Sequence, residues 1–382
     1  MNWKIPLFKI YAEDDDVEQI AEVIRSGMNW ATGPKVNELE SRVADYVGTK
    51  FAVTLNSGTS ALHAQLLAHG IGKGDEVIVP SFTFIATANC PFFVGAKPKF
   101  ADVEEQTYGL DPESVEKAIT KKTKAIMPVH VGGHACKVRE LREIADDHGI
   151  LLLEDAAESL GAKVNNKMVG TFGESSMFSF CGPKVITTGE GGVIVTDSQE
   201  IYEKIKLLRS HGRADTKDYF STNEYLDYIS LGYNFRMSNI TAALGVAQMD
   251  KLDKIINIRQ KNAAYLTKAI QKAGGAVKTP DPSKDRFVLY QMYTIESENR
   301  DALMKYLGDA GIMAKVYFPP AHLSHFYKNV LKYSPSLPMT EELARRCLTL
   351  PMYPQLTKDE MDYMAEQIGN FSSSKSPAKK RK

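Results

Sequence analysis

The chain has few cysteines and no excess of charge of either sign. Its four cysteines, Cys90, Cys136, Cys181 and Cys347, are widely scattered among 382 residues and form no CxxC pair. They show no zinc-binding spacing, so we expect no metal site and reduced thiols in a cytoplasmic protein. Lys and Arg together number 47, as do Asp and Glu. This balance gives no indication of nucleic-acid or membrane binding.

Long apolar segments and the common nucleotide-binding motifs are missing as well. No stretch approaches the roughly 20 apolar residues that a membrane span needs. The segment Trp3-Lys4-Ile5-Pro6 near the start lacks the apolar core of a signal peptide, so we expect none. A GxGxxG turn and a P-loop are both absent, which weakens dehydrogenase and kinase interpretations.

From residue 51 onward the sequence alternates between strand-like and helix-like segments. Apolar runs such as Val77-Ile78-Val79 and Leu151-Leu152-Leu153 do not alternate with polar residues, as expected for strands covered on both faces. The pattern predicts an α/β fold with a mainly parallel sheet sandwiched by helices, and ligands of such sheets bind at the carboxyl ends of the strands. The expected strands cover residues 51–55, 76–80, 97–102, 124–130, 150–155, 177–181 and 192–196.

Helical patterns precede, interrupt and follow this region. Expected helices cover residues 16–26, a segment from Val36 to Tyr46, 137–148, 198–210, and a long stretch from the plausible cap Ser238 to about Ala273. After a linker at Thr279–Ser283, we expect a small α+β unit with strands at 287–296 and 313–318 and helices at 299–310, 339–348 and 357–369.

These segments predict two domains and a tail. The N-terminal segment and a large ligand-binding domain are expected over residues 1–250, and a small C-terminal α+β domain over 251–371. Residues 372–382 are basic and of low complexity, which favours a disordered, solvated end over a nucleic-acid patch.

One lysine lies in a loop that two strands hold at both ends. Lys184 follows the expected strand at 177–181, and a glycine-rich turn leads on to the strand at 192–196. A turn lysine is most often a solvated surface residue, but a fixed, shielded amine is what a Schiff base requires. The strand at 150–155 ends with Asp155, 29 residues before Lys184. Such an amine and acid form the pair that pyridoxal phosphate needs, one for its aldehyde and one for its pyridine nitrogen.

Small polar residues between a strand and a helix offer a site for a phosphate. Ser57, Gly58 and Thr59 stand at an expected helix start, where free amides and the helix dipole favour anions. An ordinary capped turn is the alternative, because small polar residues are common helix caps. Ser179, just before the lysine loop, could donate its hydroxyl to a phosphate or merely to the backbone.

Other candidates near strand ends are weaker when taken alone. Phe84 could stack on a flat heterocycle or belong to the core. Glu158, three residues after Asp155, could lie beside the same ring or at the surface. Asn234 and Arg236 place an amide and a guanidinium in a loop before a helix, and both groups bind phosphates and carboxylates well.

Five motifs in this order resemble those of one enzyme family. They are NSGTSALHA, PSFTFIATAN, EDAAESLGA, SFCGPKVITTGEGG and GYNFRMSNITAALG. The chain is similar, from about residue 5 to residue 370, to the DegT/DnrJ/EryC1/StrS family of sugar aminotransferases. The resemblance implies the aspartate-aminotransferase fold, which is fold type I of the pyridoxal-phosphate enzymes.

The resemblance assigns cofactor roles residue by residue. Lys184 matches the lysine that bonds the cofactor, and Asp155 matches the acid at the pyridine nitrogen. Phe84 falls where the family places an aromatic over the cofactor ring, whereas Glu158 stands where many members carry glutamine. The matches to the family's phosphate ligands are Gly58, Thr59 and Ser179.

Further matches concern the partner subunit and the substrate. Asn234 matches a residue that reaches the phosphate from the neighbouring subunit, which implies a homodimer with active sites at the interface. Trp30 lies in a loop that lines the family's cleft, and Arg236 is a further candidate substrate ligand. The stretch from Tyr317 to His322 resembles the family's carboxy-terminal substrate segment. For His322, a surface histidine is the alternative.

The implied reaction moves an amino group from glutamate to a keto-sugar attached to a nucleoside diphosphate. Lys184 would move the proton, first as general base and then as general acid. We favour a 4-keto-6-deoxy sugar, and the keto position and the nucleotide depend on the shape of the pocket.

Three alternatives stay open at this point. A sugar dehydratase of the same fold carries histidine at the lysine position, so Lys184 argues against it. A catalytically idle regulator would use the fold as a binding module. A cyclitol or another non-sugar ketone could replace the sugar as acceptor.

Overall fold

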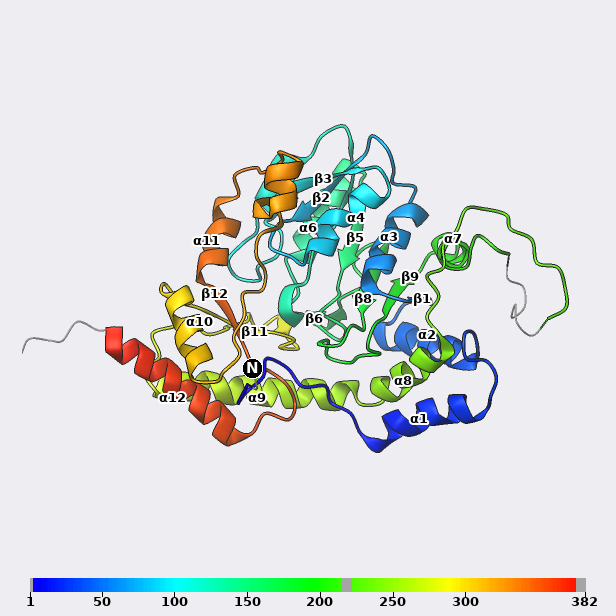
Figure 1. Ribbon diagram of the computed structural model, residues 1–382. Helices are drawn as coiled ribbons and strands as arrows, with labels where there is room; N and C mark the ends of the chain where they lie inside the picture. The colour runs from blue at the N-terminus through cyan, green and yellow to red at the C-terminus, as the bar shows by residue number, and fades with distance from the viewer. Residues whose placement is uncertain (1–2, 215–221, 376–382) are drawn as a thin grey trace, which may run out of the picture.

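A seven-stranded sheet forms the centre of the computed structural model, which describes residues 3–214 and 222–375 (Figure 1). In spatial order its strands are β1 (Phe51–Leu55), β9 (Gly192–Thr196), β8 (Ser175–Ser179), β5 (Leu151–Asp155), β4 (Thr123–Ile126), β2 (Glu76–Pro80) and β3 (Lys97–Ala101). β9 is antiparallel to both neighbours, whereas the pairs from β8 through β3 are parallel. The predicted mainly parallel seven-stranded sheet is therefore confirmed.

Helices cover both faces of this sheet. One face packs against α2 (Pro34–Val47), α5 (Pro112–Ala118), α6 (Val138–His148) and α8 (Asn239–Met249). The other face packs against α3 (Gly58–Ala68), α4 (Ile85–Phe93) and α7 (Gln199–Arg209). Consecutive strand residues serve opposite cores: Leu152 belongs to the first and Leu153 to the second. The apolar runs do not alternate with polar residues because both faces are buried.

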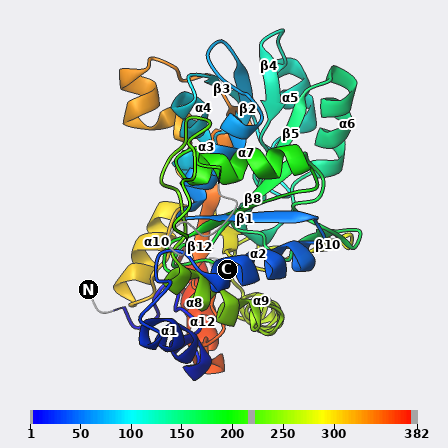
Figure 2. The ribbon, with the colours of Figure 1, turned by 90° about the vertical axis from the view of Figure 1, so that its right-hand side faces the viewer.

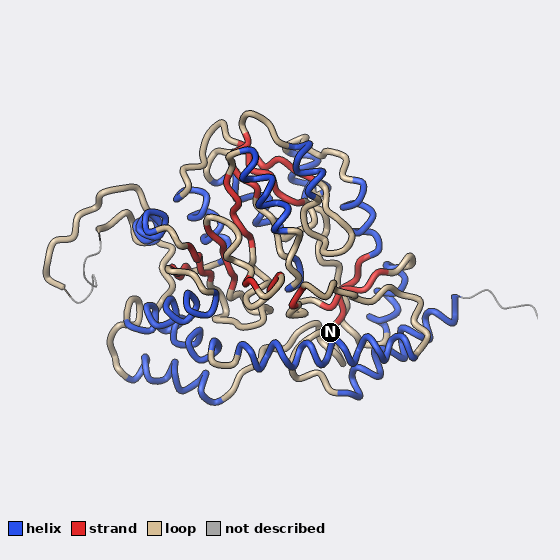
Figure 3. Tube along the Cα trace, turned by 180° about the vertical axis from the view of Figure 1, so that it is seen from behind, coloured by secondary structure: helices blue, strands red, loops and turns tan. Residues whose placement is uncertain are grey.

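A separate core lies beside this layered unit. It is built by the antiparallel pair β11 (Tyr293–Glu296) and β12 (Cys347–Leu350), by α10 (Arg300–Asp309) and α12 (Lys358–Lys375), and by the later turns of α9 (Leu252–Lys272). Ile5 is fully buried in the same core and pairs with Ile312. The first turns of α9 belong to the sheet's core and its last turns to this one. The long helix at the base of Figure 3 therefore joins the two units.

The remaining described elements are short or lie at the edges. They are α1 (Asp14–Arg25), η1 (Val131–Gly133), β6 (Lys163–Val164), β7 (Lys167–Met168), β10 (Arg286–Phe287), η2 (Ala321–Leu323), η3 (Phe326–Val330) and α11 (Pro338–Arg346). α1 packs on α8 and α8 packs on α2, and in Figure 2 these three helices lie below β1. None of the helices within the described ranges is long and apolar enough to span a lipid bilayer.

The structure corrects several sequence-based expectations. The helix expected from 238 to 273 is two helices, since the chain turns at Asp250 and Lys251. Lys251 is buried at this turn and its Nζ contacts the carboxylates of Asp15 and Asp16 in α1, at 2.7 and 2.9 Å. Ser238 does cap α8, as expected, by accepting from the Thr241 N–H. Periodicity misses the break because it follows from a contact far away in sequence.

The C-terminal unit also differs from the expectation. The strand expected at 313–318 is a single bridge, between Lys315 and Thr349. Residues 347–350, of which the first two were expected to end a helix, form β12. α12 continues through Lys375, past the expected start of the tail at 372, and residues 376–382 of that tail lie outside the described residues. The domain boundary expected at 250/251 stays a prediction.

Candidate active site

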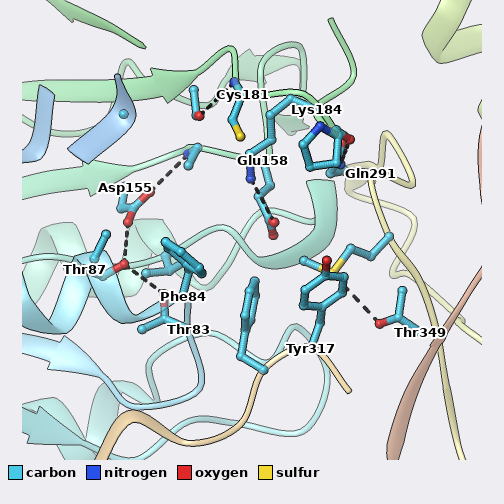
Figure 4. A pocket seen from close by; sticks show the side chains of 18 of the residues that line it. Thr83, Phe84, Thr87, Asp155, Glu158, Cys181, Lys184, Gln291, Tyr317 and Thr349 are labelled. Carbon is cyan, nitrogen blue, oxygen red and sulfur yellow. Dashed lines mark hydrogen bonds and ion pairs between the residues drawn. The ribbon is translucent and has the colours of Figure 1, made fainter. Parts of the chain in front are cut away.

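The loop between β8 and β9 presents Lys184 inside the protein. Two backbone hydrogen bonds close its base: Phe180 N–H donates to Gly191 O and Thr188 N–H donates to Phe180 O, each over 2.9 Å. The Lys184 side chain is 17% exposed, and its Nζ donates to Glu158 Oε1 over 3.2 Å. Figure 4 shows the two side chains pointing toward one another. The amine is therefore fixed and largely shielded from solvent.

Asp155 stands at the carboxyl end of β5, in the middle of the sheet, and is 3% exposed. Thr87 Oγ1, from α4, donates to Asp155 Oδ2 over 2.7 Å, and the N–H of Ala157 donates to Oδ1 over 3.1 Å. Burial raises the pKa of the Asp155 carboxyl above its usual value despite these donors. A positive charge placed against such a carboxylate favours its ionised form. The site is thus suited to a cationic partner.

The N-terminus of α3 opens onto the same cavity. Ser57 caps the helix, because its Oγ accepts from the Ser60 N–H over 3.0 Å. Gly58 and Thr59 follow, and the first amides of a helix have no intrahelical partner and favour anions. A Cβ at Gly58 would lie 3.2 Å from Ser179 Oγ, so any larger residue would crowd the space between the helix start and β8.

These groups line one cavity of about 430 Å³. Phe84 stands at its wall with 61% of the residue exposed, and its ring is 6.4 Å from that of Phe318. Its face is available for stacking on a flat ligand. The sequence-predicted residues that line the cavity are Ser57, Gly58, Thr59, Phe84, Asp155, Glu158, Ser179, Lys184 and Tyr317.

Three predicted residues lie away from this cavity. Trp30 is 50% exposed, and its carbonyl accepts from the Asn239 N–H. The Asn234 carbonyl accepts from the Asn56 side chain over 3.3 Å. Arg236 lies in the same loop. The contacts expected of Asn234 involve a second subunit, so its role and those of Trp30 and Arg236 stay predictions.

His322 is not brought to the cavity either. It is fully buried. Ser81 Oγ lies 2.6 Å from its Nδ1 and accepts from its backbone N–H over 3.0 Å. Its Nε2 lies 3.5 Å from Glu341 Oε1, and burial lowers the pKa of the ring. His322 is therefore not the surface histidine of the alternative, and it does not line the cavity, so its role toward the substrate stays a prediction.

Several cavity residues were not predicted from the sequence. Thr87 holds Asp155, and Gln291 Nε2 donates to the carbonyl of Pro183 over 2.6 Å. Glu190 and Lys315 add one charge of each sign to the lining. Thr87 lies within the PSFTFIATAN motif and Glu190 within SFCGPKVITTGEGG, so the motifs could have identified these two as site residues. Gln291 and Lys315 lie in none of the five motifs, and nothing in the sequence pointed to them.

Glu154, the residue before Asp155 in β5, is a second buried carboxylate. It binds the loop at residues 170–173. It accepts from the N–H groups of Gly170, Phe172 and Gly173 at 2.8–2.9 Å, and from His130 Nε2 at 3.0 Å. Burial raises the pKa of the Glu154 carboxyl, but the hydrogen bonds from His130 and these amides outweigh it, so the pKa lies below its usual value.

Replacing Glu154 with alanine is expected to lower the free energy of unfolding by about 3–5 kcal/mol, because buried donors lose their acceptor. Urea unfolding at pH 7 measures this loss. Since the folded pKa lies below the unfolded one, the contribution is present at neutral pH and disappears as pH falls through the folded value. The difference between wild type and variant should therefore shrink in acid. Glu154→Gln, which keeps one acceptor, should lose less, and equal losses at all pH values would contradict the assignment.

The groups that line this cavity fit pyridoxal phosphate. Lys184 offers a shielded amine, Asp155 an anion for a pyridinium, α3 a phosphate cradle and Phe84 an aromatic face. This constellation lies at the carboxyl ends of a mainly parallel sheet, where such folds bind ligands. Fold and site together define a fold type I pyridoxal-phosphate enzyme.

Comparison with known proteins narrows this class. A model of the DegT/DnrJ/EryC1/StrS aminotransferase family matches residues 11–369, and the chain belongs to this family. GDP-perosamine synthase of Vibrio cholerae is 36% identical over 372 residues, which cover 96% of this chain and 99% of the relative. The protein is therefore a pyridoxal-phosphate-dependent aminotransferase, and the idle-regulator and dehydratase alternatives are set aside.

Solved structures agree with this assignment. DesV from S. venezuelae, solved with a ketimine intermediate, is 32% identical with a TM-score of 0.89, and the match covers 96% of this chain and 98% of that one. The PLP form of Spr1654 from Streptococcus pneumoniae is 27% identical with a TM-score of 0.89, over 98% of this chain and 99% of that one. The predicted fold and cofactor are confirmed.

Proposed function

We propose that this aminotransferase moves an amino group from glutamate to a keto-sugar linked to a nucleoside diphosphate. A 4-keto-6-deoxy sugar is the preferred acceptor. The observation that carries the proposal is a single cavity that holds Lys184 and Asp155 in a member of this family. The match to a GDP-perosamine synthase over nearly the full length of both chains supports a nucleotide-sugar substrate.

Several residues of the cavity have a proposed task toward the cofactor. Pyridoxal phosphate, when bound, supplies an electron sink for the carbanion formed at the donor's α-carbon. Asp155 would keep the ring nitrogen protonated, and Phe84 would offer its ring for stacking. Lys184 would take the proton from the donor's α-carbon and pass it to C4′ of the cofactor, and in the second half-reaction it would carry a proton from C4′ to the acceptor carbon. Ser57, Gly58, Thr59 and Ser179 would hold the phosphate.

The outer part of the cavity is suited to a polar, anionic substrate. Lys315 and Tyr317 both line it, and the Lys315 ammonium lies 4.7 Å from the Tyr317 ring centre. A cation next to an aromatic face can bind a carboxylate or a phosphate while the ring contacts a sugar. We therefore assign these two residues to the substrate, while Trp30 and Arg236 stay candidate substrate ligands.

A homodimer with active sites at its interface is part of the proposal. Large apolar side chains are exposed after the gap at 215–221: Tyr225 is 83% exposed, Ile229 61% and Leu231 80%. Exposed large apolar residues can mark a protein interface. Asn234 comes shortly after them in the sequence, and the family resemblance gives it a contact with the partner's cofactor phosphate.

Half-reaction screening tests the proposed substrate. The holoenzyme is first converted with glutamate to its amino form, seen as loss of the starting cofactor absorbance. Keto-sugars linked to guanosine, thymidine or uridine diphosphate are then added, with 3-keto and 4-keto members of each. We expect a 4-keto-6-deoxy sugar nucleotide to restore the starting spectrum. Recovery with a cyclitol ketone and with none of the sugars would show that the acceptor assignment is wrong.

A further inference from the structure

Glu158 is a carboxylate in direct contact with the amine of the site. Its Oε1 accepts from Lys184 Nζ over 3.2 Å, and its Oε2 accepts from the N–H of Gly132 over 2.8 Å. The Glu158 side chain is 9% exposed. Both of its oxygens are thus engaged, and the contact is only weakly screened by solvent and salt.

We propose that Glu158 controls the charge on the Lys184 nitrogen. An ionised carboxylate within about 4–6 Å favours the protonated form of a basic group. When Lys184 takes the proton from the donor's α-carbon, its amine becomes an ammonium next to Glu158. Lys184 then passes this proton to C4′ of the cofactor, and Glu158 takes up no proton in the step. The step needs no further reactant, since the proton that enters Lys184 also leaves from it.

Other charged groups line the same cavity but are turned to different partners. Asp155 accepts from Thr87 and the backbone, and Glu190 Oε1 lies 3.7 Å from Cys181 Sγ. The ammonium of Lys315 lies over an aromatic ring. On the side of Gly132, His130 and Glu154 face one another, and Tyr108, His134 and Lys137 line a separate pocket with Gly132. Glu158 is therefore the carboxylate placed to act on the lysine nitrogen at contact distance.

Hydrogen bonds to the backbone from Gln291 and Met292, in the segment that leads into β11, hold the two sides of this ion pair in position. Gln291 Nε2 donates to the carbonyl of Pro183, the residue before the lysine, over 2.6 Å. Met292 N–H donates to the carbonyl of Gly132, whose own N–H holds Glu158, over 3.1 Å. Gln291 thus affects where the amine lies without carrying charge. Substitutions at Glu158 and at Gln291 therefore test the charge and the position of the amine separately.

A pH titration of the cofactor absorbance in the holoenzyme tests the proposal without any substrate. The spectrum of the bound cofactor responds to protonation at the Lys184 nitrogen. In Glu158→Gln, which keeps the size and loses the charge, we expect the midpoint to fall by about one pH unit or more. Glu158→Asp keeps the charge and should stay closer to wild type. If E158Q does not fold, Glu158→Met serves the same purpose with the same expected shift.

Two control variants show whether the midpoint depends on the carboxylate in contact with Lys184, on any carboxylate in the cavity, or on the position of the lysine. Glu190→Gln removes a carboxylate from the same cavity and should move the midpoint much less than E158Q. Gln291→Ala should lower turnover and leave the midpoint near the wild-type value. An unchanged midpoint in E158Q, or an equal shift in E190Q, would overturn the proposal.

The proposal rests on the cofactor and aminotransferase class and is independent of the sugar. A failed sugar screen therefore leaves the titration result valid. Conversely, an unchanged midpoint refutes the role of Glu158 and leaves the proposed acceptor untouched.

Discussion

Replacing Lys184 with alanine is expected to lower turnover by at least about 10⁴-fold. The variant loses the amine that bonds the cofactor and the group that moves the proton, and general acid–base catalysis alone contributes about 10²–10⁴-fold. The measurement is formation of the keto acid from glutamate, together with the absorbance of the purified protein. The absorbance that depends on the lysine bond should be missing in the variant.

Lys315→Ala provides the matched control for this experiment, because Lys315 lines the same cavity. It should keep the lysine-dependent absorbance and act mainly on KM for the substrate. If K184A kept turnover within about tenfold of wild type, or if K315A lost the same absorbance, Lys184 would not be the lysine that bonds the cofactor.

The fold was predictable where burial alone decides the local structure. The strands at 51–55, 76–80 and 192–196 were predicted with their observed bounds. Each is a short apolar run whose residues divide between two cores. β12 was missed because Cys347–Leu350 forms a strand only through its antiparallel register with β11, which lies far away in the sequence.

 In that register Tyr293 pairs with Leu350 and Glu296 with Cys347. No local pattern in either segment contains this pairing.

The gathering of the candidate cofactor residues in one cavity was largely predictable, because they follow strand ends within recognisable motifs. Asp155 ends β5 and Lys184 follows β8, and strand ends of a parallel sheet meet at one edge. The rest depends on which way a loop side chain points. His322 lies in a segment expected to contact substrate, yet its ring turns to Ser81 and Glu341. Gln291 comes from an irregular segment and enters the cavity only because the two units pack together.

Replacing Asp155 with asparagine is expected to lower turnover on the order of 10³-fold, the loss typical when an electrostatic group at a reacting centre is removed. Asparagine keeps the size of the side chain and can still accept from the Ala157 N–H, while the Thr87 hydroxyl can reverse and accept from the new amide. What disappears is the negative charge that would keep a bound pyridine nitrogen protonated. Single-turnover rates with glutamate, measured on the cofactor-saturated variant, give this loss directly.

The free energy of unfolding of Asp155→Asn should stay the same or rise while its turnover falls. This difference distinguishes the loss of a charge from damage to the fold. Burial raises the pKa of Asp155 above its unfolded value, so ionised Asp155 costs stability at pH values above the unfolded pKa. Without cofactor, Asp155→Asn should therefore unfold at the same or a higher urea concentration than wild type at pH 8. Thr87→Val is the control: it removes one hydrogen bond and keeps the charge, so it should lose far less activity. A D155N protein that unfolds earlier than wild type, or T87V losing as much turnover, would mean that the carboxylate acts through packing and not through its charge.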